Sequence, residues 1–393
     1  MNRAQYDVAI VGAGLVGLAL GVALARAGLA VSIVDRNGIA AGEAPVDGSW
    51  DTRVYAVSPG SAEFLRALGA WQRLPGERVE AIEAMQIFGD VDGRLGFSAY
   101  ELGERALAWI VEHRELNAAL VEAMRTQPGI DVVAPCLPVA ISWHADGAEL
   151  RLDDGRVVAA RLVAGTDGIH SWVRAQAGML QEPRPYEQSA VVANFTIERA
   201  HRGRAFQWFH GGDGVMAWLP LPGRRMSMVW SAPQELATDL LAAEPKRLAQ
   251  RVEVQGRAAL GKLELITPAA RFPLSFLKLP SVVAHRLALV GDAAHGVHPL
   301  AGQGLNLGFG DVAALLAVLA GRGAIDDPGA PILLESYARR RAAPVLAMQT
   351  ATDGLARLFG TPAPWLRGLR NRGMSAVDAI GPLKKLLAQP ALR

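Results

Sequence analysis

Cysteine is nearly absent from this sequence of 393 residues, in which Cys136 stands alone. A single thiol excludes an intramolecular disulfide and any metal site built from several cysteines, and it fits a reducing cytoplasm. We expect Cys136 to be a small core residue. The sequence also lacks a Gly-x-Ser-x-Gly elbow and a His-Glu-x-x-His segment. We therefore expect neither a serine hydrolase nor a zinc peptidase, and we predict no metal.

An excess of charge of one sign is also missing, since 40 Lys and Arg residues stand against 38 Asp and Glu residues. No basic run dominates, so the sequence predicts no nucleic-acid partner. Val8 to Ala25 carries no charge, but four glycines interrupt this run. That pattern predicts a nucleotide-binding strand, turn and helix rather than a membrane span or signal peptide. We expect a cytoplasmic protein.

The first motif with a chemical meaning is Gly12-Ala-Gly14-Leu-Val-Gly17, which follows the apolar run Tyr6–Val11. Glycines at these positions let a strand turn sharply into a helix whose N-terminus meets a pyrophosphate. A second predicted strand ends at Asp35, at the distance where an acidic residue holds a ribose. The motif predicts a dinucleotide site and leaves FAD and NAD open.

A second motif runs from Arg286 to Asn306, as a strand, an acid and a glycine-rich loop before a helix. Asp292 stands where the carboxyl end of a strand meets a ligand crevice. Gly302 to Asn306 would present backbone N–H groups at the start of a helix, whose dipole favours the negative charge of reduced flavin. NAD dehydrogenases have no use for this element so far downstream, so the second motif indicates FAD.

The chain resembles the class A flavin monooxygenases, and within them the ubiquinone-biosynthesis hydroxylases. Gly291–Gly308 is similar to their Gly-Asp-Ala-Ala-His to Gly-Gln-Gly-x-Asn-Leu-Gly signature, Asp51–Ala56 to their Asp-x-Arg-Val-x-Ala segment, and Leu162–Arg174 to their Asp-Gly motif. The resemblance covers nearly the whole chain. His113 departs from it, because the family more often has asparagine there.

The resemblance implies an α/β fold with a Rossmann-like FAD-binding domain of the glutathione-reductase type. Aromatic residues and prolines between about 185 and 280 predict an inserted, mostly antiparallel sheet for the substrate. We predict a discontinuous FAD-binding domain (1–75, 105–182 and 282–330), a substrate domain (76–104 and 183–281) and a helical C-terminal region (331–393).

Carried over by motif, the resemblance implies residues for each part of the cofactor. The N-terminal glycines and Asp35 would hold the ADP half, and two arginines would approach the pyrophosphate and ribityl region. Asp292 would bind the ribityl chain, and the late loop, with Pro299 and Gly302–Asn306, would border the flavin ring. In chain order these residues are Gly12, Gly14, Leu15, Gly17, Asp35, Arg36, Arg53, Arg114, Asp167, Asp292, Pro299, Gly302, Gln303, Gly304, Leu305 and Asn306. From the residues alone, an arginine such as Arg53 or Arg114 is more often a surface ion-pair partner than a ligand.

The implied reaction is the hydroxylation of a polyprenylated phenol or quinone precursor in ubiquinone biosynthesis. NADPH or NADH reduces FAD, O2 adds to form a flavin hydroperoxide, and OH passes to the ring. No side-chain nucleophile is needed. His295 and His298 are weak candidates for proton transfer, and they could instead brace their loop. Phe206, Trp208 and Trp218 could contact the lipophilic substrate or belong to the core.

Apolar and basic residues mix after residue 355, which is typical of a helix lying on the inner face of a membrane, or of a helix packed on the flavin domain. A ubiquinone-biosynthesis complex is a further expected partner. Other functions stay open: a flavin hydroxylase of another small aromatic, an FAD-dependent prenyl reductase, a halogenase, or an FAD-bound scaffold. The halogenase is disfavoured because Trp208-Phe-His-Gly lacks the Trp-x-Trp-x-Ile-Pro form.

Overall fold

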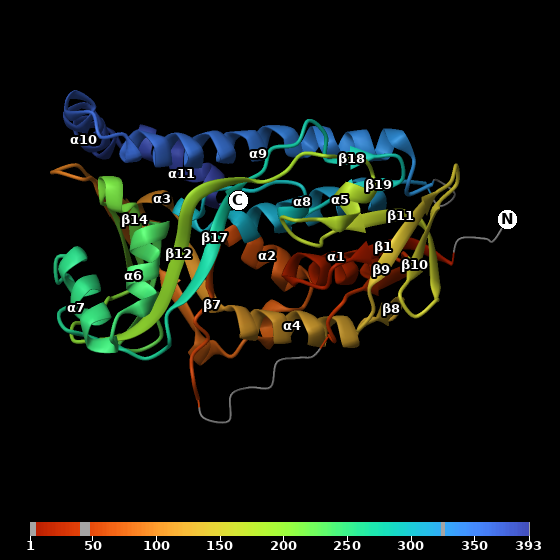
Figure 1. The fold of residues 1–393 in the computed structure, drawn as a ribbon, viewed down its shortest axis with the longest axis horizontal. Helices are drawn as coiled ribbons and strands as arrows, with labels where there is room; N and C mark the ends of the chain where they lie inside the picture. Colours follow the sequence, from red (N-terminus) through yellow and green to blue (C-terminus); the bar gives the residue numbers. More distant parts are fainter. Residues whose placement is uncertain (1–4, 40–47, 324–326, 393) are drawn as a thin grey trace.

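The structure is a computed structural model that describes residues 5–39, 48–323 and 327–392. Two large sheets lie at opposite ends of the molecule, and the long helix α9 (Pro331–Gly360) runs along one side past both (Figure 1). A small third sheet lies between them, formed by β3 (Val54–Val57), β7 (Ala108–Glu112) and β4 (Val79–Ile82). The chain is therefore built around two separate sheets with a bridging layer.

The first large sheet is mainly parallel, in the order β18-β19-β11-β1-β2-β8. Its inner strands are short apolar runs buried on both faces, as a parallel sheet covered by helices requires. Three helices cover one face, α1 (Leu15–Arg26), α4 (His113–Arg125) and α8 (Gly304–Ala320). The strands are β1 (Tyr6–Val11), β2 (Val31–Val34), β8 (Ile130–Val133), β11 (Val157–Gly165), β18 (Val283–Ala284) and β19 (Leu287–Leu289), with β9 (Pro138–Trp143) and β10 (Ala148–Leu152) extending β11 antiparallel.

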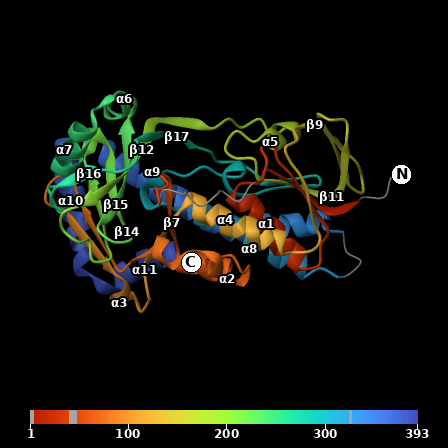
Figure 2. The same cartoon turned by 90° about the horizontal axis from the view of Figure 1, so that it is seen from below.

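The second large sheet is mostly antiparallel, in the order β16-β12-β15-β14-β13-β5-β6, with β17 also paired to β12. One face is covered by α6 (Gln234–Ala242) and α7 (Pro245–Gln255), and the other looks toward the first sheet (Figure 2). Alternation along each strand sends successive side chains to opposite faces. The strands are β5 (Ala84–Phe88), β6 (Arg94–Ser98), β12 (Arg184–Ile197), β13 (Arg204–Phe209), β14 (Val215–Leu221), β15 (Arg225–Pro233), β16 (Leu263–Leu265) and β17 (Ala270–Phe276).

The C-terminal region is helical, as predicted, and continues from α9 into α10 (Pro364–Ala379) and α11 (Gly381–Leu392). Prolines begin α9 and α10, where the missing N–H costs nothing. Within the described ranges, no helix combines the length and the apolarity that crossing a bilayer requires. The remaining elements are α2 (Pro59–Ala67), α3 (Ala99–Leu102), α5 (Trp172–Gln176), and the short 3-10 turns η1 (Trp71–Arg73), η2 (Gly76–Arg78), η3 (Gly211–Asp213), η4 (Gly291–Ala293) and η5 (Pro299–Ala301).

Candidate functional site

Segments that are far apart in the sequence meet at the carboxyl edge of the first sheet. Strands β19, β11, β1 and β2 are neighbours there and run parallel. Their carboxyl ends lead into Gly291, Thr166, Gly12 and Asp35 respectively. Ligands of open α/β sheets bind in the crevice outside these ends. The sheet order therefore brings both glycine motifs and the Asp-Gly loop to one place.

Glycine is required for a different structural reason at each of the three positions of the first turn, Gly12, Gly14 and Gly17. Gly12 has φ +106°, and a Cβ there would lie 2.6 Å from the carbonyl oxygen of Thr166. A Cβ on Gly17 would lie 2.0 Å from the carbonyl oxygen of Gly12, so helix and strand need a glycine to pack. A Cβ on Gly14, the cap of α1, would meet nothing within 4 Å. Only Gly14 keeps backbone open toward a ligand, whereas Leu15 is buried in the core.

Asp35 closes this turn from the end of β2. Its carboxylate accepts hydrogen bonds from the backbone N–H of Ala13 at 2.6 Å and of Asn37 at 2.7 Å. The acid therefore lies directly against the glycine turn, where a ribose would sit beside a pyrophosphate. Arg36 follows it with an exposed side chain.

The Asp-Gly loop after β11 packs against the same turn. The hydroxyl of Thr166 donates to the carbonyl of Gly12 at 2.7 Å. One carboxylate oxygen of Asp167 accepts from the backbone N–H of Val173, while the other is buried and has no partner. A buried acceptor without a donor is costly in a finished protein, so this oxygen suits a ligand that donates hydrogen bonds.

Arg174 connects the Asp-Gly loop to the late glycine-rich segment. Its side chain is buried, and it donates to the carbonyl oxygens of Ala293 at 3.0 Å and Ile169 at 2.9 Å. Burial lowers the pKa of Arg174, an effect that Asp167 and Glu182 oppose. We had not expected a structural role for this arginine, although it ends the Asp-Gly motif.

Asp292 stands beside the loop of β3. Solvent still reaches the side chain, but the protein packed around the carboxyl group desolvates it and thereby raises its pKa. The charges of His295 and Arg53 act in the opposite direction and lower the pKa. The Arg53 guanidinium lies 5.2 Å from the ring centres of both Tyr55 and Phe272. No ion-pair partner of Arg53 is present among the described residues. Aromatic rings thus hold the Arg53 guanidinium without neutralising its charge. The guanidinium lies close to Asp292, the acid predicted to bind the ribityl hydroxyls.

Arg114 is used differently, in a network with buried acids. Its guanidinium lies 3.4 Å from Glu112 and 3.6 Å from Glu115, and it donates to the carbonyl of Ser49. Asp51 organises the same loop by accepting from the backbone N–H groups of Arg53 and Arg114, both at 3.0 Å. Asp51 was quoted in a motif but not predicted as a site residue. The sequence signal for this role of Asp51 is its position two residues before Arg53, because an Asp side chain in a turn often accepts from the backbone N–H two residues later.

The late loop is fixed to the segment after β3 by one amide side chain. Gly302 adopts φ +61° at the end of η5, and α8 begins two residues later with no acid in its first turn. Asn306 accepts from the N–H of Ser58 at 3.0 Å and donates to the carbonyl of Ala56 at 2.9 Å. Gln303 accepts from the same amide, and Leu305 packs on the core. Among the described residues, no acid and no side-chain cap occupies the N-terminus of α8, where the helix dipole favours a negative group.

A buried acid behind this loop was missed by the sequence analysis. Asp311 is the only charged residue of α8 and is completely buried. Its carboxylate accepts from the N–H of Gly291 at 2.8 Å, from His295 at 2.6 Å and from Arg341 at 2.6 Å. Burial alone would raise the pKa of Asp311, but these donors lower it overall. A lone acid in an apolar helix is a sequence signal for such a partnered charge.

The two candidate histidines lie in unlike surroundings. Burial works against a charge on His295, but Asp311 outweighs it and raises the pKa of the imidazole, so His295 is engaged in a structural ion pair. Burial lowers the pKa of His298 to about 4, so this ring is neutral at pH 7. His298 bonds Gln188 at 3.0 Å through Nε2, its edge contacts Tyr186, and its buried Nδ1 has no partner. His298 therefore has a buried nitrogen without a partner, next to Pro299.

The register of the second sheet separates its aromatic side chains. Phe206, Trp208 and Trp218 belong to the core between this sheet and α6 and α7. Their neighbours Phe209 and Val215 lie on the opposite face, in a cluster with Leu300 of η5. The three aromatic substrate candidates therefore do not pack with the late loop, whereas Phe209 and Val215 do.

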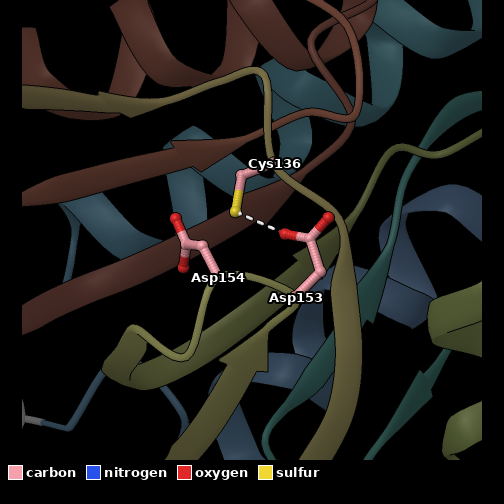
Figure 3. Close-up of side chains that lie close together, drawn as sticks. All are labelled: Cys136, Asp153 and Asp154. Carbon is pink, nitrogen blue, oxygen red and sulfur yellow. Dashed lines mark hydrogen bonds between the residues drawn. The ribbon is translucent and has the colours of Figure 1, made fainter.

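Cys136 lies beside Asp35, whose carbonyl oxygen accepts from its backbone N–H at 2.8 Å, and its side chain belongs to a core cluster of the first sheet. Its thiol donates to the carboxylate of Asp153 at 3.0 Å, with Asp154 close by (Figure 3). Burial and these two acids raise the pKa of the thiol. Within the described part of the chain this is the one group of three with metal-ligand geometry, and two of its members are exposed acids. The hydrogen bond accounts for the arrangement without a metal, and Cys136 is the core residue that we predicted.

Comparison with known proteins agrees with this geometry. Residues 5–352 match the family described as FAD binding domain. The chain is 36% identical to the ubiquinone hydroxylase UbiL of Rhodospirillum rubrum, over 98% of this chain and 89% of that protein. It is 34% identical to the 3-demethoxyubiquinol 3-hydroxylase of Escherichia coli over the full length of both. The solved structure of pqsL, a probable FAD-dependent monooxygenase from Pseudomonas aeruginosa, has the same fold, with 24% identity, a TM-score of 0.78, and coverage of 94% of this chain and 99% of that one. The chain belongs to the FAD-dependent monooxygenases, in the family of the ubiquinone hydroxylases.

Proposed function

We propose that the protein hydroxylates the aromatic ring of a polyprenylated phenol or quinone precursor in ubiquinone biosynthesis, with NADPH or NADH as electron donor and O2 as the oxygen source. The names of two full-length relatives support the pathway. The observation that carries the proposal is the meeting of the glycine turn, the Asp-Gly loop and the late loop at one edge of the first sheet.

We propose that FAD lies along this edge. The open backbone at Gly14 and the N-terminus of α1 would meet the pyrophosphate, and Asp35 would meet the ribose. The unpaired oxygen of Asp167 and the exposed carboxyl of Asp292 suit the hydroxyl groups of the cofactor, with Arg53 beside them. When bound, FAD supplies the electron transfer and the activation of O2. The first turn of α8 would stabilise negative charge on the flavin ring.

We place the reacting ring of the substrate against the face of the second sheet that carries Phe209 and Val215. This face packs with Leu300 in the late loop, and an apolar surface beside the flavin excludes water from the reaction. Phe206, Trp208 and Trp218 would support the strands from behind. His298 is the stronger of the two proton-transfer candidates, because it is neutral and has a free nitrogen next to Pro299.

We also propose that α10 and α11 contact the inner face of a membrane, where a polyprenylated substrate resides. Trp365 and Leu369 on α10 are 73% and 61% exposed, and Leu386 on α11 is 64% exposed. Arg372 and Lys385 are exposed on the same two helices. Apolar and basic side chains together favour an anionic lipid surface. Sedimentation with phosphatidylglycerol vesicles tests this contact, and equal binding to neutral vesicles would count against the charge argument.

The decisive experiment uses purified protein loaded with FAD, NADPH or NADH, and isotopically labelled O2. A demethoxyubiquinol with a short prenyl chain should gain one labelled oxygen on its ring, seen by mass spectrometry. A simple phenol that is hydroxylated just as efficiently would favour a flavin hydroxylase of small aromatics. Reduction of the prenyl chain without ring oxidation would favour a prenyl reductase. Protein that takes up no flavin would contradict every version of the proposal.

A further inference from the structure

A pocket of about 540 Å³ opens at the end of the second sheet, outside the region described so far. It lies between the end of β13, the turn η3, the end of α7 and the junction of α9 with α10. Its volume falls within the range of small-molecule sites. Its lining includes aromatic and charged side chains, among them Trp208, Phe209, Phe359, Asp90, Arg257 and Arg367.

Two stacked rings separate this outer pocket from the late loop. Phe209 and Phe359 lie with ring centres 3.9 Å apart and planes at 21°, and each is 3% exposed. Both line the pocket, and both also belong to the cluster that contains Leu300. The partition between the pocket and the η5 turn is therefore made of side chains from this small cluster.

Arg370 of α10 holds one of the two rings in place. Its guanidinium lies 5.2 Å from the centre of Phe359 and donates to the carbonyl oxygens of Leu358 and Thr361 at the end of α9. The same side chain pairs with Asp90 in the turn between β5 and β6. Arg370 thus ties the last turn of α9 to the second sheet, and the position of Phe359 depends on it.

The two rings also stand next to joints in the backbone. Phe209 ends β13 just before a turn in which Gly211 and Gly214 have φ of +60° and +86°. Phe359 is the second-last residue of α9, before the break that precedes α10. Residues at the ends of elements can absorb a change of backbone angles without disturbing a sheet or helix. A displacement of either ring would therefore be absorbed by the backbone at the end of its own element.

We propose that the stacked pair Phe209–Phe359 is a gate between the outer pocket and the late loop, and that Arg370 is a positioning residue for this gate. A substrate whose aromatic ring carries a bulky apolar substituent would first occupy the outer pocket, and the ring would then pass the gate. This inference rests on the proposed function, because it assigns the pocket to that reaction.

Rapid mixing of FAD-loaded protein with decylphenol tests the gate without requiring turnover. Trp208 lines the pocket, so quenching of its fluorescence reports the first step; a Trp208→Phe variant identifies this signal among the nine tryptophans. The flavin absorbance reports arrival of the ring at the late loop. We expect quenching first and the flavin change later. Phe359→Ala should accelerate the second step about tenfold and Phe359→Trp should slow it. Phe359→Leu serves if the alanine variant does not fold.

Arg370 has a control in Arg357, an exposed arginine of α9 that pairs with Asp353 on the same helix and does not line the pocket. Arg370→Gln should accelerate the second step, Arg370→Lys should lie between it and the wild type, and Arg357→Gln should leave the step unchanged. Simultaneous signals in every variant, or rates that ignore the size of residue 359, would overturn the gate. If either of these outcomes is observed and hydroxylated product still forms, the gate is contradicted but the proposed function is not. If binding occurs in two steps but no hydroxylated product forms, the proposed function is contradicted but the gate is not.

Discussion

Asp311 offers the sharpest test of how the late loop is held. The substitution Asp311→Asn keeps the shape of the side chain and removes its charge. The carboxylate now accepts three hydrogen bonds, from Gly291, His295 and Arg341, while fully buried. An amide presents one oxygen and one NH2 group, so at least one of these donors must face another donor. The Arg341 side chain, 11% exposed, would also lose its counter-charge.

The expected magnitude follows from this arrangement. Removing one partner from a buried ion pair costs about 3–5 kcal/mol, because the remaining charge is left uncompensated. The oxygen of asparagine can still accept from some of these donors, so we expect a loss at the lower end of this range, about 3 kcal/mol in the free energy of unfolding. The N–H of Gly291 precedes Asp292, and a looser turn there should raise the Kd for FAD about tenfold. The pKa of His295 should fall, since burial would no longer be opposed by Asp311.

Urea unfolding of the FAD-free protein measures the first effect, and recovery of flavin fluorescence on dilution measures the second. Asp239→Asn is the control, because Asp239 is an exposed acid on α6. The pair Asp311→Leu with Arg341→Met should be more stable than Asp311→Asn, since no unpaired charge remains. A loss below about 1 kcal/mol, with an unchanged Kd for FAD, would refute the reasoning.

Three further outcomes follow from the contacts. Gly17→Ala should yield little folded protein, because its Cβ would lie 2.0 Å from the carbonyl oxygen of Gly12. Gly14→Ala should fold normally and bind FAD about tenfold more weakly. The flavin-to-protein ratio and the Tm of FAD-free protein distinguish the two effects, and unchanged FAD affinity in Gly14→Ala would count against the open backbone. Asn306→Leu should lose about 3 kcal/mol in urea unfolding, since two buried backbone groups lose their partner, and a neutral result would show that water replaces the amide. Burial lowers the pKa of His298 to about 4 in the folded protein, below its ordinary 6.5. As the pH falls from about 6.5 to 4, the unfolded chain therefore takes up a proton that the folded protein does not, and the free energy of unfolding decreases by roughly 3 kcal/mol. His298→Gln should flatten that decline between about pH 6.5 and pH 4, and an identical pH profile in the variant would contradict the assignment.

The histidines show what tertiary structure adds to a motif. His295 and His298 stand three residues apart in one loop, and nothing local distinguishes them. Asp311, itself paired with Arg341, reaches His295 from a later helix, whereas Gln188 and Tyr186 reach His298 from the second sheet. Partners so distant in the sequence leave no spacing to read, so one histidine becomes structural and the other stays available only after folding.

The face of the second sheet that packs with the late loop could not be predicted from the sequence for a related reason. Alternation predicts that Phe206 and Trp208 share a face, but it does not say which face meets the cofactor domain. That choice depends on where α6 and α7 cover the sheet. The pocket beside Phe359 was equally invisible, because its walls come from segments about 150 residues apart.

The sequence by itself determined the elements whose causes are local: the glycine turn of Gly12–Gly17, the strand before Asp35, and the loop and helix of Gly302–Ala320. Short-range sterics and hydrogen bonding fix such pieces, so the residue pattern is sufficient. Only the tertiary structure decided their neighbours, such as Asn306 on Ser58, Asp311 on Gly291 and Phe359 on Phe209. Those contacts depend on the strand order and on helix packing across the whole chain, which local patterns do not encode.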